Sequence, residues 1–519
     1  MTMTDPERIP VIIGGGQIND RPADPTQGLD SLQLMAAALH AAEANIGDGR
    51  ILADLDSLAI VDQISFREFI DLSANLAELL GIDPAINYQS AGLHGDTPIR
   101  LLNEAANRIG AGEARLCAVV GGEALRTARA RQQEAAFQDK LLGANRSVPD
   151  DGETPNPVRQ IAATARPNYN QAYGLVSPVD VYPLYENAGR AAYGQTLAEA
   201  QDESAAIWSL MSEVAAANEN AWIRRSHSRE EILTIDDNNR RIAHPYSKLM
   251  VANSVVNQGA AVILASLAEA RRRGVADQDI IYVGMGAAAR EAGNIAKRDR
   301  YDRSVSMDIA IRRCLALNGM AAEDLDFVEL YSCFPCVTKM ARRTLGWPVD
   351  KPATVFGGLT FGGAPLANYM SHAVVSMASK LRAEGGTGFL FANGGFATDN
   401  HCMVLSSQPI AAATFPQDFD YRAEADAARE AIPLLDEGYI GPVTIETYTI
   451  FYRRNGTPRA GVIVGLTPDG ARTLAHVDVS DETMVVFLTD GQIEPVGTSG
   501  TIVGMGDDRR VFVRGPDTV

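Results

Sequence analysis

The sequence predicts an α/β protein made of two related halves, each a mostly parallel sheet covered by helices, with a small antiparallel β domain at the C-terminus. Three observations predict this fold. A series of landmarks in the first half of the chain recurs in the same order further along. In both copies short apolar strands alternate with amphipathic helices, as in parallel sheets that are covered on both faces. After Pro409 short apolar β segments, of which 484–488 is the third, are separated by the turns Asn455-Gly456, Asp469-Gly470 and Asp490-Gly491, which are typical of β-hairpins.

The repeat is defined by three pairs of matching segments. They are an acidic turn before an apolar strand (54–62, DLDSLAIVD, and 324–332, DLDFVELYS), a proline that opens a helix (Pro98 and Pro365), and a strand that ends in Gly-Gly (117–123, CAVVGGE, and 390–396, LFANGGF). A proline in the first turn of a helix has no N–H to leave unpaired. Three landmarks in one order at nearly one offset indicate a duplication, so we expect the two halves to superpose.

The repeat divides the chain into three domains. Residues 1–270 form the N-terminal half and include an insertion at 125–250, residues 271–410 form the C-terminal half, and residues 411–519 form the additional β-rich domain. The insertion carries one long helical pattern, at about 197–223, and insertions over the active face of a fold often act as lids. We therefore expect the insertion to cover the site.

Composition limits the possible partners. The chain has 519 residues and a formal net charge of -19, which disfavours nucleic acid and anionic membrane surfaces as partners. An anionic ligand would need a local basic site. Five cysteines do not form a disulfide framework, and neither a secretory signal nor a membrane-spanning run is evident, so a cytoplasmic location is expected.

The predicted site lies at the sheet edge where strands end and helices begin. Four loops are expected there: 94–97, 331–336, 361–368 and 393–401. In the second loop, Cys333 lies just before a predicted helix, where the helix dipole favours thiolate and supports a nucleophile or an acid–base cysteine. A buried structural cysteine explains it equally well. No metal site is expected, because Cys333 and Cys336 have no second ligand pair nearby.

The histidines differ in their support for a site. His94 lies in a glycine-rich turn of a predicted site loop, which slightly favours a functional role. His372 lies in the helix after Pro365, where packing is a little better supported than catalysis. The run VIIGGGQI at 11–18 does not have the spacing of a dinucleotide fingerprint, so no nicotinamide cofactor is expected.

At these four loops the chain resembles the thiolase superfamily over roughly its first 410 residues. The motifs ELYSCFP, TFGGAPLANYMSH and ANGGF are similar to those of thiolase-like proteins of the acetyl-CoA acetyltransferase type that carry an additional C-terminal domain. The resemblance implies a thiolase fold, a role in lipid metabolism, a coenzyme A (CoA) thioester as substrate, no bound cofactor and a homodimer.

Compared with thiolases, this sequence has lost several catalytic groups. The resemblance places Gly95 where thiolases carry the nucleophilic cysteine, Ala364 at the histidine of the Gly-His-Pro loop and Asn393 at the second cysteine. Only Cys333 coincides with a position that is cysteine in the sterol-carrier type of thiolase. Ordinary thiolysis needs an acyl-accepting thiolate and a second group that moves the α-proton.

Three functions remain open from the sequence. The first is an acyl-CoA acyltransferase with a rearranged site. The second is a thiolase-like retro-aldolase in which a tyrosine performs the acid–base chemistry, and the third is a non-catalytic CoA-ester-binding subunit. The candidate catalytic residues are Cys333, Tyr331, His94 and His372, and the candidate substrate-binding residues are Gly95, Gly363, Asn368, Asn393 and Gly394.

Overall fold

A computed structural model describes residues 5–47, 49–141, 168–506 and 509–515. In the N-terminal half, five strands lie in the order β3-β2-β4-β7-β1. Their bounds are β1 (Pro10–Asn19), β2 (Ser57–Ile60), β3 (Ile86–Gln89), β4 (Leu116–Ala124) and β7 (Asn257–Ser266). Only β7 runs against the other four, because β2 is parallel to β3 and β4 while β7 is antiparallel to β4 and β1.

The C-terminal half repeats this arrangement. Its strands lie in the order β10-β11-β12-β8, and β9 also pairs with β12. Their bounds are β8 (Ile281–Val283), β9 (Ala287–Arg290), β10 (Phe327–Leu330), β11 (Thr387–Gly394) and β12 (Asp399–Ser406). The strand β12 is the antiparallel one, as β7 is in the first half. Matching β2, β4, β7 and β1 with β10, β11, β12 and β8 gives one shared strand order, so the predicted duplication is confirmed.

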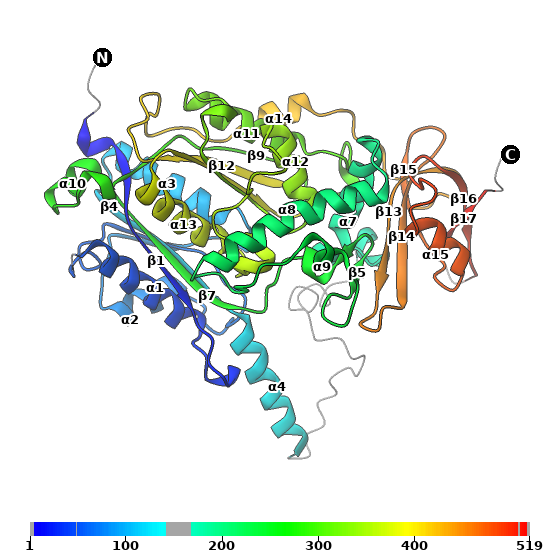
Figure 1. Ribbon diagram of the computed structural model, residues 1–519, viewed down its shortest axis with the longest axis horizontal. Helices are drawn as coiled ribbons and strands as arrows, with labels where there is room; N and C mark the ends of the chain where they lie inside the picture. The colour runs from blue at the N-terminus through cyan, green and yellow to red at the C-terminus, as the bar shows by residue number, and fades with distance from the viewer. Residues whose placement is uncertain (1–4, 48, 142–167, 507–508, 516–519) are drawn as a thin grey trace.

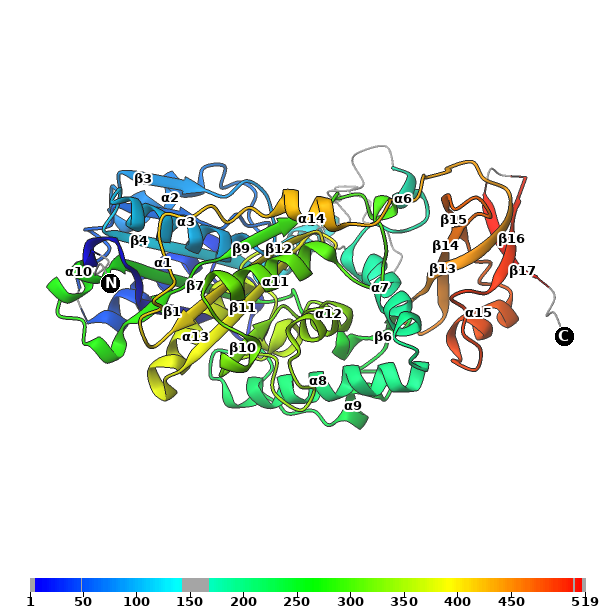
Figure 2. The same cartoon turned by 90° about the horizontal axis from the view of Figure 1, so that it is seen from above.

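The helices and the two half-sheets form layers (Figure 2). Helices α3 (Thr97–Ala111) and α13 (Tyr369–Glu384) pack on each other and on strands of both halves. On the outer faces, α1 (Ser31–Ile46) and α2 (Leu72–Leu80) cover the N-terminal half, and α11 (Val305–Leu317) covers the C-terminal half beside α12 (Pro335–Leu345). The half-sheets join where β1 pairs briefly with β8, and α10 (Leu267–Arg272) follows β7.

One helix start was predicted wrongly. Pro98 lies in the first turn of α3, but Pro365 lies four residues before α13, which begins at Tyr369. Gly363 and Ala367 have φ angles of 102° and 63°, and a left-handed backbone cannot continue a right-handed helix. The matched prolines therefore lie on equivalent connections without both opening a helix.

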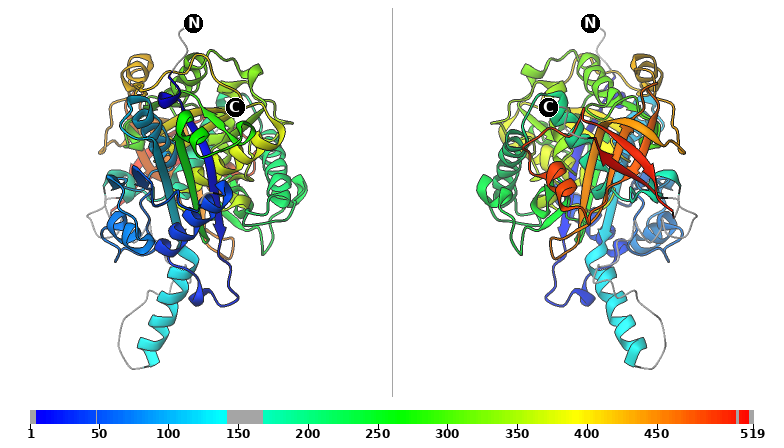
Figure 3. Two further views of the ribbon diagram at one scale, coloured as in Figure 1. Left: turned by 90° about the vertical axis from the view of Figure 1, so that its left-hand side faces the viewer. Right: turned by 90° about the vertical axis from the view of Figure 1, so that its right-hand side faces the viewer.

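The insertion after β4 is mostly helical. Its elements are α4 (Leu125–Leu141), α6 (Tyr169–Ala172), α7 (Pro178–Ala192), α8 (Leu197–Ala217), α9 (Arg229–Leu233), β5 (Arg241–Ala243) and β6 (Tyr246–Ser247). Helix α4 projects away from the rest of the chain (Figures 1 and 3). The predicted long helix ends at Ala217 rather than near residue 223, since the next residue, Asn218, is already extended. Strand β5 pairs with β13, so the insertion contributes to the C-terminal sheet.

The C-terminal domain is a small closed barrel. It comprises β13 (Gly441–Tyr452), β14 (Pro458–Leu466), β15 (Arg472–His476), α15 (Glu482–Thr489), β16 (Ser499–Gly504) and β17 (Arg510–Arg514). The strand order β14-β15-β17-β16-β13 closes through pairing of β13 with β14, and only the β15–β17 pair is parallel. The connecting segment before the barrel carries α14 (Arg422–Ala428).

Two of the predicted hairpin turns are confirmed and one is wrong. Gly456 and Gly470 have positive φ angles in the turns that join β13 to β14 and β14 to β15. The third apolar run, at 484–488, is part of α15 instead of a strand. Asp481 caps this helix by accepting hydrogen bonds from the N–H groups of Thr483 and Met484. A short apolar run does not by itself distinguish a strand from a buried helix.

Candidate active site

Three predicted loops meet at Gly95, two residues before α3. A Cβ atom placed on Gly95 would lie 2.2 Å from the carbonyl oxygen of Asn393 and 2.4 Å from the hydroxyl oxygen of Tyr331. Gly394 is also close, because a Cβ atom placed on it would be 3.2 Å from the Gly95 nitrogen. The structure therefore brings Gly95, Tyr331, Asn393 and Gly394 together in one group, the Gly95 cluster. It leaves no room for a side chain at Gly95.

Tyr331 presents a neutral phenol at this point. Its side chain is buried, and its ring packs edge-on against Tyr369 at a centroid distance of 5.8 Å. Within the described ranges its hydroxyl has no hydrogen-bond partner. Burial raises the pKa of Tyr331 well above its usual value, and the nearby Cys333 and Asp96 raise it further. The hydroxyl is thus available to donate a hydrogen bond or a proton.

Cys333 lies two residues before α12, as predicted, but burial dominates its ionisation. Its side chain is in the core, and burial raises the pKa of the thiol to about 12 although hydrogen bonding from Tyr182 acts in the opposite direction. Cys336 lies in the first turn of α12, and burial raises its pKa well above the usual value. The thiolate that a helix start would favour is therefore disfavoured at neutral pH.

A chain of directed hydrogen bonds holds the amide of Asn393. The hydroxyl of Tyr182, from α7, donates to Asn393 Oδ1 at 3.0 Å, and Asn393 Nδ2 donates to Asn400 Oδ1 at 2.9 Å. Asn400 Nδ2 donates to Ser306 Oγ at 2.8 Å, and Ser306 Oγ donates to Glu291 Oε1, also at 2.8 Å.

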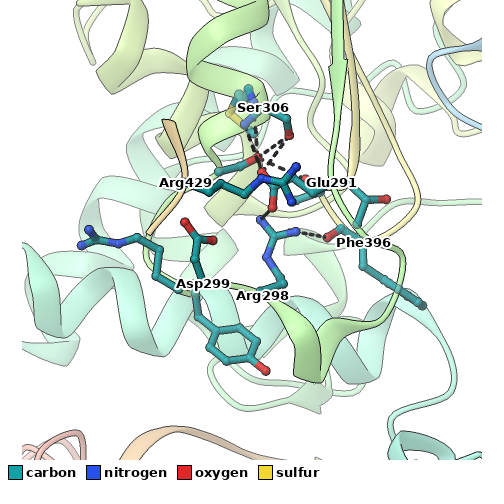
Figure 4. Close-up of polar contacts among 12 residues, drawn as sticks. Glu291, Arg298, Asp299, Ser306, Phe396 and Arg429 are labelled. Carbon is teal, nitrogen blue, oxygen red and sulfur yellow. Dashed lines mark hydrogen bonds and ion pairs between the residues drawn. The ribbon is translucent and has the colours of Figure 1, made fainter. Parts of the chain in front are cut away.

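The chain ends in a buried ion pair (Figure 4). Arg298 Nη2 lies 2.7 Å from Glu291 Oε2, and both side chains are almost completely buried. Because a carboxylate only accepts hydrogen bonds, this pair fixes the direction of every bond back to Tyr182. Arg298 is held in turn by the C-terminal barrel, since the Arg472 guanidinium donates to the carbonyl groups of Arg298 and, at 3.0 Å, of Ala296.

His94 lies at the solvent side of the cluster. Its Nδ1 faces Asp399 Oδ2 at 3.6 Å, and Arg290 Nη2 lies 2.6 Å from the other oxygen of the same carboxylate. Hydrogen bonding with Asp399 raises the pKa of His94, and burial opposes the rise. Asp96, next to Gly95, is buried, and burial followed by the charge of Asp399 raises its pKa. This side of the site carries charged groups that can hold or move protons.

In the described ranges the other predicted residues make no hydrogen bond or ring contact with Tyr331. His372 is fully buried in the first turn of α13, where its Nδ1 lies 2.8 Å from Gln17 Oε1 and its ring stacks on Phe356. Burial lowers its pKa to about 3, which makes it a neutral packed histidine. The backbone of Gly363 lies against Gln258, and the buried amide of Asn368 lies against Gly121.

Sequence reasoning did not identify Asp96, Tyr182, Arg290 and Asp399 as site residues. Asp96 and Asp399 lie inside two of the predicted loops, so a search for acids beside the glycine turns would have found both. Tyr182 and Arg290 lie outside all four loops, and they reach the site only through the packing of α7 and β9. Among the residues with described positions, no group of His, Cys, Asp and Glu side chains could hold a metal ion. Nor is any helix in those ranges long and apolar enough to cross a membrane.

Comparison with known proteins identifies the class to which the fold belongs. Residues 425–507 match the family model of the additional C-terminal domain of thiolase-like protein type 1. The structure is similar to that of a monomeric SCP2-thiolase like protein type 1 from Mycobacterium smegmatis, with a TM-score of 0.81 and 28% identity over 99% of this chain and 100% of that one. The chain is a thiolase-fold protein.

More particularly, the chain is similar to thiolase-like proteins of type 1 both in its overall fold and in its additional C-terminal domain. A curated relative, the acetyl-CoA acetyltransferase of Methanocaldococcus jannaschii, is 23% identical over 333 residues, which are 62% of this chain and 80% of that protein. Because the M. smegmatis protein is described as monomeric, the expected homodimer is not supported.

Two solved structures share the fold at lower identity. The Ltp2-ChsH2(DUF35) aldolase has a TM-score of 0.56 and 16% identity, and covers 78% of this chain and 98% of that one. Human mitochondrial 3-ketoacyl-CoA thiolase, solved in complex with CoA, has a TM-score of 0.57 and 15% identity with the same coverage.

Proposed function

We propose that this protein binds a CoA thioester and acts by acid–base catalysis on a carbon–carbon bond of the acyl group, with Tyr331 as proton donor and no acyl-enzyme. One observation carries the proposal: the hydroxyl of Tyr331 fills the space that a side chain at Gly95 would need. A thiolase nucleophile at that position is thereby replaced by a phenol. The human mitochondrial 3-ketoacyl-CoA thiolase, which was solved with CoA, supports CoA thioesters as the ligand class. The Ltp2-ChsH2(DUF35) aldolase supports carbon–carbon bond cleavage as the reaction class.

The proposed reaction is cleavage of a β-hydroxyacyl-CoA. A base removes the proton of the β-hydroxyl, the Cα–Cβ bond breaks, and its electron pair moves onto Cα as the thioester enolate. Tyr331 then donates a proton to Cα, which releases a shorter acyl-CoA and a carbonyl product. We assign the base to Asp96, which follows Gly95, because its pKa is raised and its Oδ1 is buried without a hydrogen-bond partner in the described part of the chain. Proton transfer from Asp96 back to Tyr331 restores the enzyme.

Acyl transfer through Cys333 is the second candidate. The M. jannaschii acetyl-CoA acetyltransferase favours it, since that protein matches 62% of this chain. The pKa of about 12 for the Cys333 thiol opposes it, because the thiolate is the nucleophile in such a reaction.

Two variants separate the candidates. Tyr331→Phe removes only the hydroxyl, and Cys333→Ala removes only the thiol. Both are assayed with a β-hydroxyacyl-CoA for cleavage and with labelled acetyl-CoA for covalent transfer, the latter by intact mass. We expect Tyr331→Phe to lower kcat for cleavage by ~100-fold or more and Cys333→Ala to retain it, with no mass added to the parent protein.

The opposite results would refute the proposal. An acetylated parent protein whose label disappears in Cys333→Ala would establish acyl transfer. Binding of CoA esters with no turnover of any ester tested would leave the binding-subunit function.

A further inference from the structure

Two cavities adjoin the Gly95 cluster on its solvent side. Their volumes are about 350 Å³ and 560 Å³, and they share His94, Arg290, Asp399 and Arg422 as lining residues. The smaller cavity also reaches Asp96 and Asn400, which connect to Gly95 and Asn393. The larger one is also lined by Asp426 and Arg429 of the connecting segment that carries α14. Space for part of a ligand therefore exists beside the proposed reaction centre.

The larger cavity carries an excess of positive charge when His94 is protonated. Its basic lining residues are His94, Arg290, Arg422 and Arg429, and its acidic lining residues are Glu291, Asp399 and Asp426. Glu291 is neutralised from behind by the buried Arg298, which does not line the cavity. Asp399 serves both His94 and Arg290. In a chain with a net charge of -19, this cavity is a local basic site.

Among the basic residues of the larger cavity, Arg422 is the one whose guanidinium remains available to bind an anionic ligand. It lines both cavities, and its guanidinium has no hydrogen bond or ion pair among the described residues. Arg429 lies further along the same segment, lines the larger cavity together with Glu291, and pairs with the exposed Asp426. An unpaired arginine beside a cavity is suited to a carboxylate or phosphate, which its planar fork binds with two hydrogen bonds.

The segment that presents Arg422 is fixed in place. The Ala288 N–H of β9 donates to the Phe419 carbonyl at 2.7 Å, and the Tyr421 N–H donates to the Ala288 carbonyl at the same distance. Glu424 of α14 pairs with Arg313 of α11 at 2.7 Å. Arg422 is therefore held over the cavity by contacts on both sides of it in sequence.

We propose that the larger cavity binds an anionic group of the substrate, and that the group is a carboxylate at the far end of the acyl chain. The proposal rests on the proposed function, because it places the thioester at Gly95. The CoA phosphates are separated from the thioester by the whole pantetheine arm, whereas His94 immediately precedes Gly95. An acyl carboxylate a few bonds from the thioester therefore fits the cavity better than a phosphate. The substrate class is then a dicarboxylic acyl-CoA.

Matched ligands test the assignment on the full-length protein. Succinyl-CoA and butyryl-CoA have acyl chains of the same length and differ in the terminal carboxylate. Calorimetric titration should show succinyl-CoA binding at least ~10-fold more tightly, the usual scale for a charge-assisted hydrogen bond. Arg422→Gln should remove that difference and leave butyryl-CoA binding within ~2-fold. Arg271→Gln, at an exposed arginine of α10, is the control and should change neither affinity.

Each other outcome has a defined meaning. Equal affinity of the parent for the two esters would overturn the carboxylate assignment while leaving the proposed function standing. If Arg422→Gln weakens the binding of CoA and of both esters equally, and the binding of pantetheine is unaffected, the site binds the CoA phosphates. That result would also overturn the carboxylate assignment. If no CoA ester binds, the proposed function fails. Free glutarate then tests the cavity alone: a signal lost in Arg422→Gln supports it, and no signal in the parent overturns it.

Discussion

Replacing Gly95 by cysteine would return a thiol to the position where thiolases carry their nucleophile, and we expect the fold to resist it. The Cβ atom would lie 2.2 Å from the Asn393 carbonyl oxygen and 2.4 Å from the Tyr331 hydroxyl, whereas contacts below 3.0 Å are essentially never made by real Cβ atoms. The closer atom belongs to the backbone of a buried strand, so it cannot rotate away. Gly95→Ala carries the same Cβ and should therefore have most of the same effect.

The expected cost follows from two opposing effects. Overpacking a well-packed core destabilises by about 1–3 kcal/mol, and a rigid backbone neighbour places this position at the upper end, about 3 kcal/mol. A Gly-to-Ala change also restricts the unfolded chain, which stabilises the fold by about 0.4–1 kcal/mol. The free energy of unfolding should therefore fall by about 2 kcal/mol in Gly95→Ala, and by at least as much in Gly95→Cys.

Denaturant unfolding measures this difference as a lower midpoint at an unchanged slope. Gly49→Ala is the matched control, because nothing lies within 4 Å of a Cβ atom at that position, and its midpoint should not fall. Adding Tyr331→Phe to Gly95→Ala should recover only part of the loss, since the Asn393 carbonyl stays in place. A Gly95→Cys protein with the parent's midpoint that becomes acylated by acetyl-CoA would refute the reasoning.

Three further predictions concern ionisation and domain docking. Iodoacetamide at pH 8 should leave Cys333 and Cys336 unmodified in the folded protein and alkylate them in urea, as measured by peptide mass, because burial raises both pKa values; rapid alkylation of the folded protein would contradict this. Asp399→Asn should lower the pKa of His94, as measured by NMR titration of the ring, because the hydrogen bond with Asp399 is the main cause of the raised pKa. The stability that this pair adds is present below the unfolded pKa of His94 and is lost as the pH rises through its folded pKa. Arg472→Ala should lower the free energy of unfolding by about 3–5 kcal/mol, because it leaves the Glu446 carboxylate without its ion-pair partner, whereas Arg313→Ala, at an exposed pair, should cost less than about 1 kcal/mol.

Much of the fold could be predicted because each landmark of the repeat is encoded in a short segment of the sequence. The acidic turns before β2 and β10, and the glycine pairs at the ends of β4 and β11, can be read from short segments, and their shared order predicts the duplicated sheet. Long-range pairing has no such signal. Nothing near residues 241–243 indicates that β5 would pair with the C-terminal barrel, and the positive φ angle of Ala367 was not foreseeable from its residue type.

The candidate site could be predicted only in part, for the same reason. Gly95, Tyr331 and Asn393 were named from separate loops. Tyr331 and Asn393 lie at the ends of the paired strands β10 and β11, whereas Gly95 follows β3 at the opposite end of the sheet and meets them at the start of α3, which packs on β12. The ionisation of Cys333 could not be predicted, since a helix start and burial act in opposite directions and only the packing decides between them. His372 shows the opposite case, in which a residue of the right type near the right loop turns out to be packed on Phe356.

The position of Tyr331 connects the altered chemistry to the additional domain. A phenol at Gly95 can act only if the groups around it keep one arrangement, and the amide of Asn393 is held by bonds that run to the Glu291–Arg298 pair. Arg298 in turn has its carbonyl held by Arg472 of the barrel. A change at Arg472 should therefore alter kcat for the proposed cleavage even where folding is retained at low temperature. The barrel contributes no side chain to the Gly95 cluster in the described ranges, so its effect on turnover would be exerted through the position of Asn393 and not through contact with substrate.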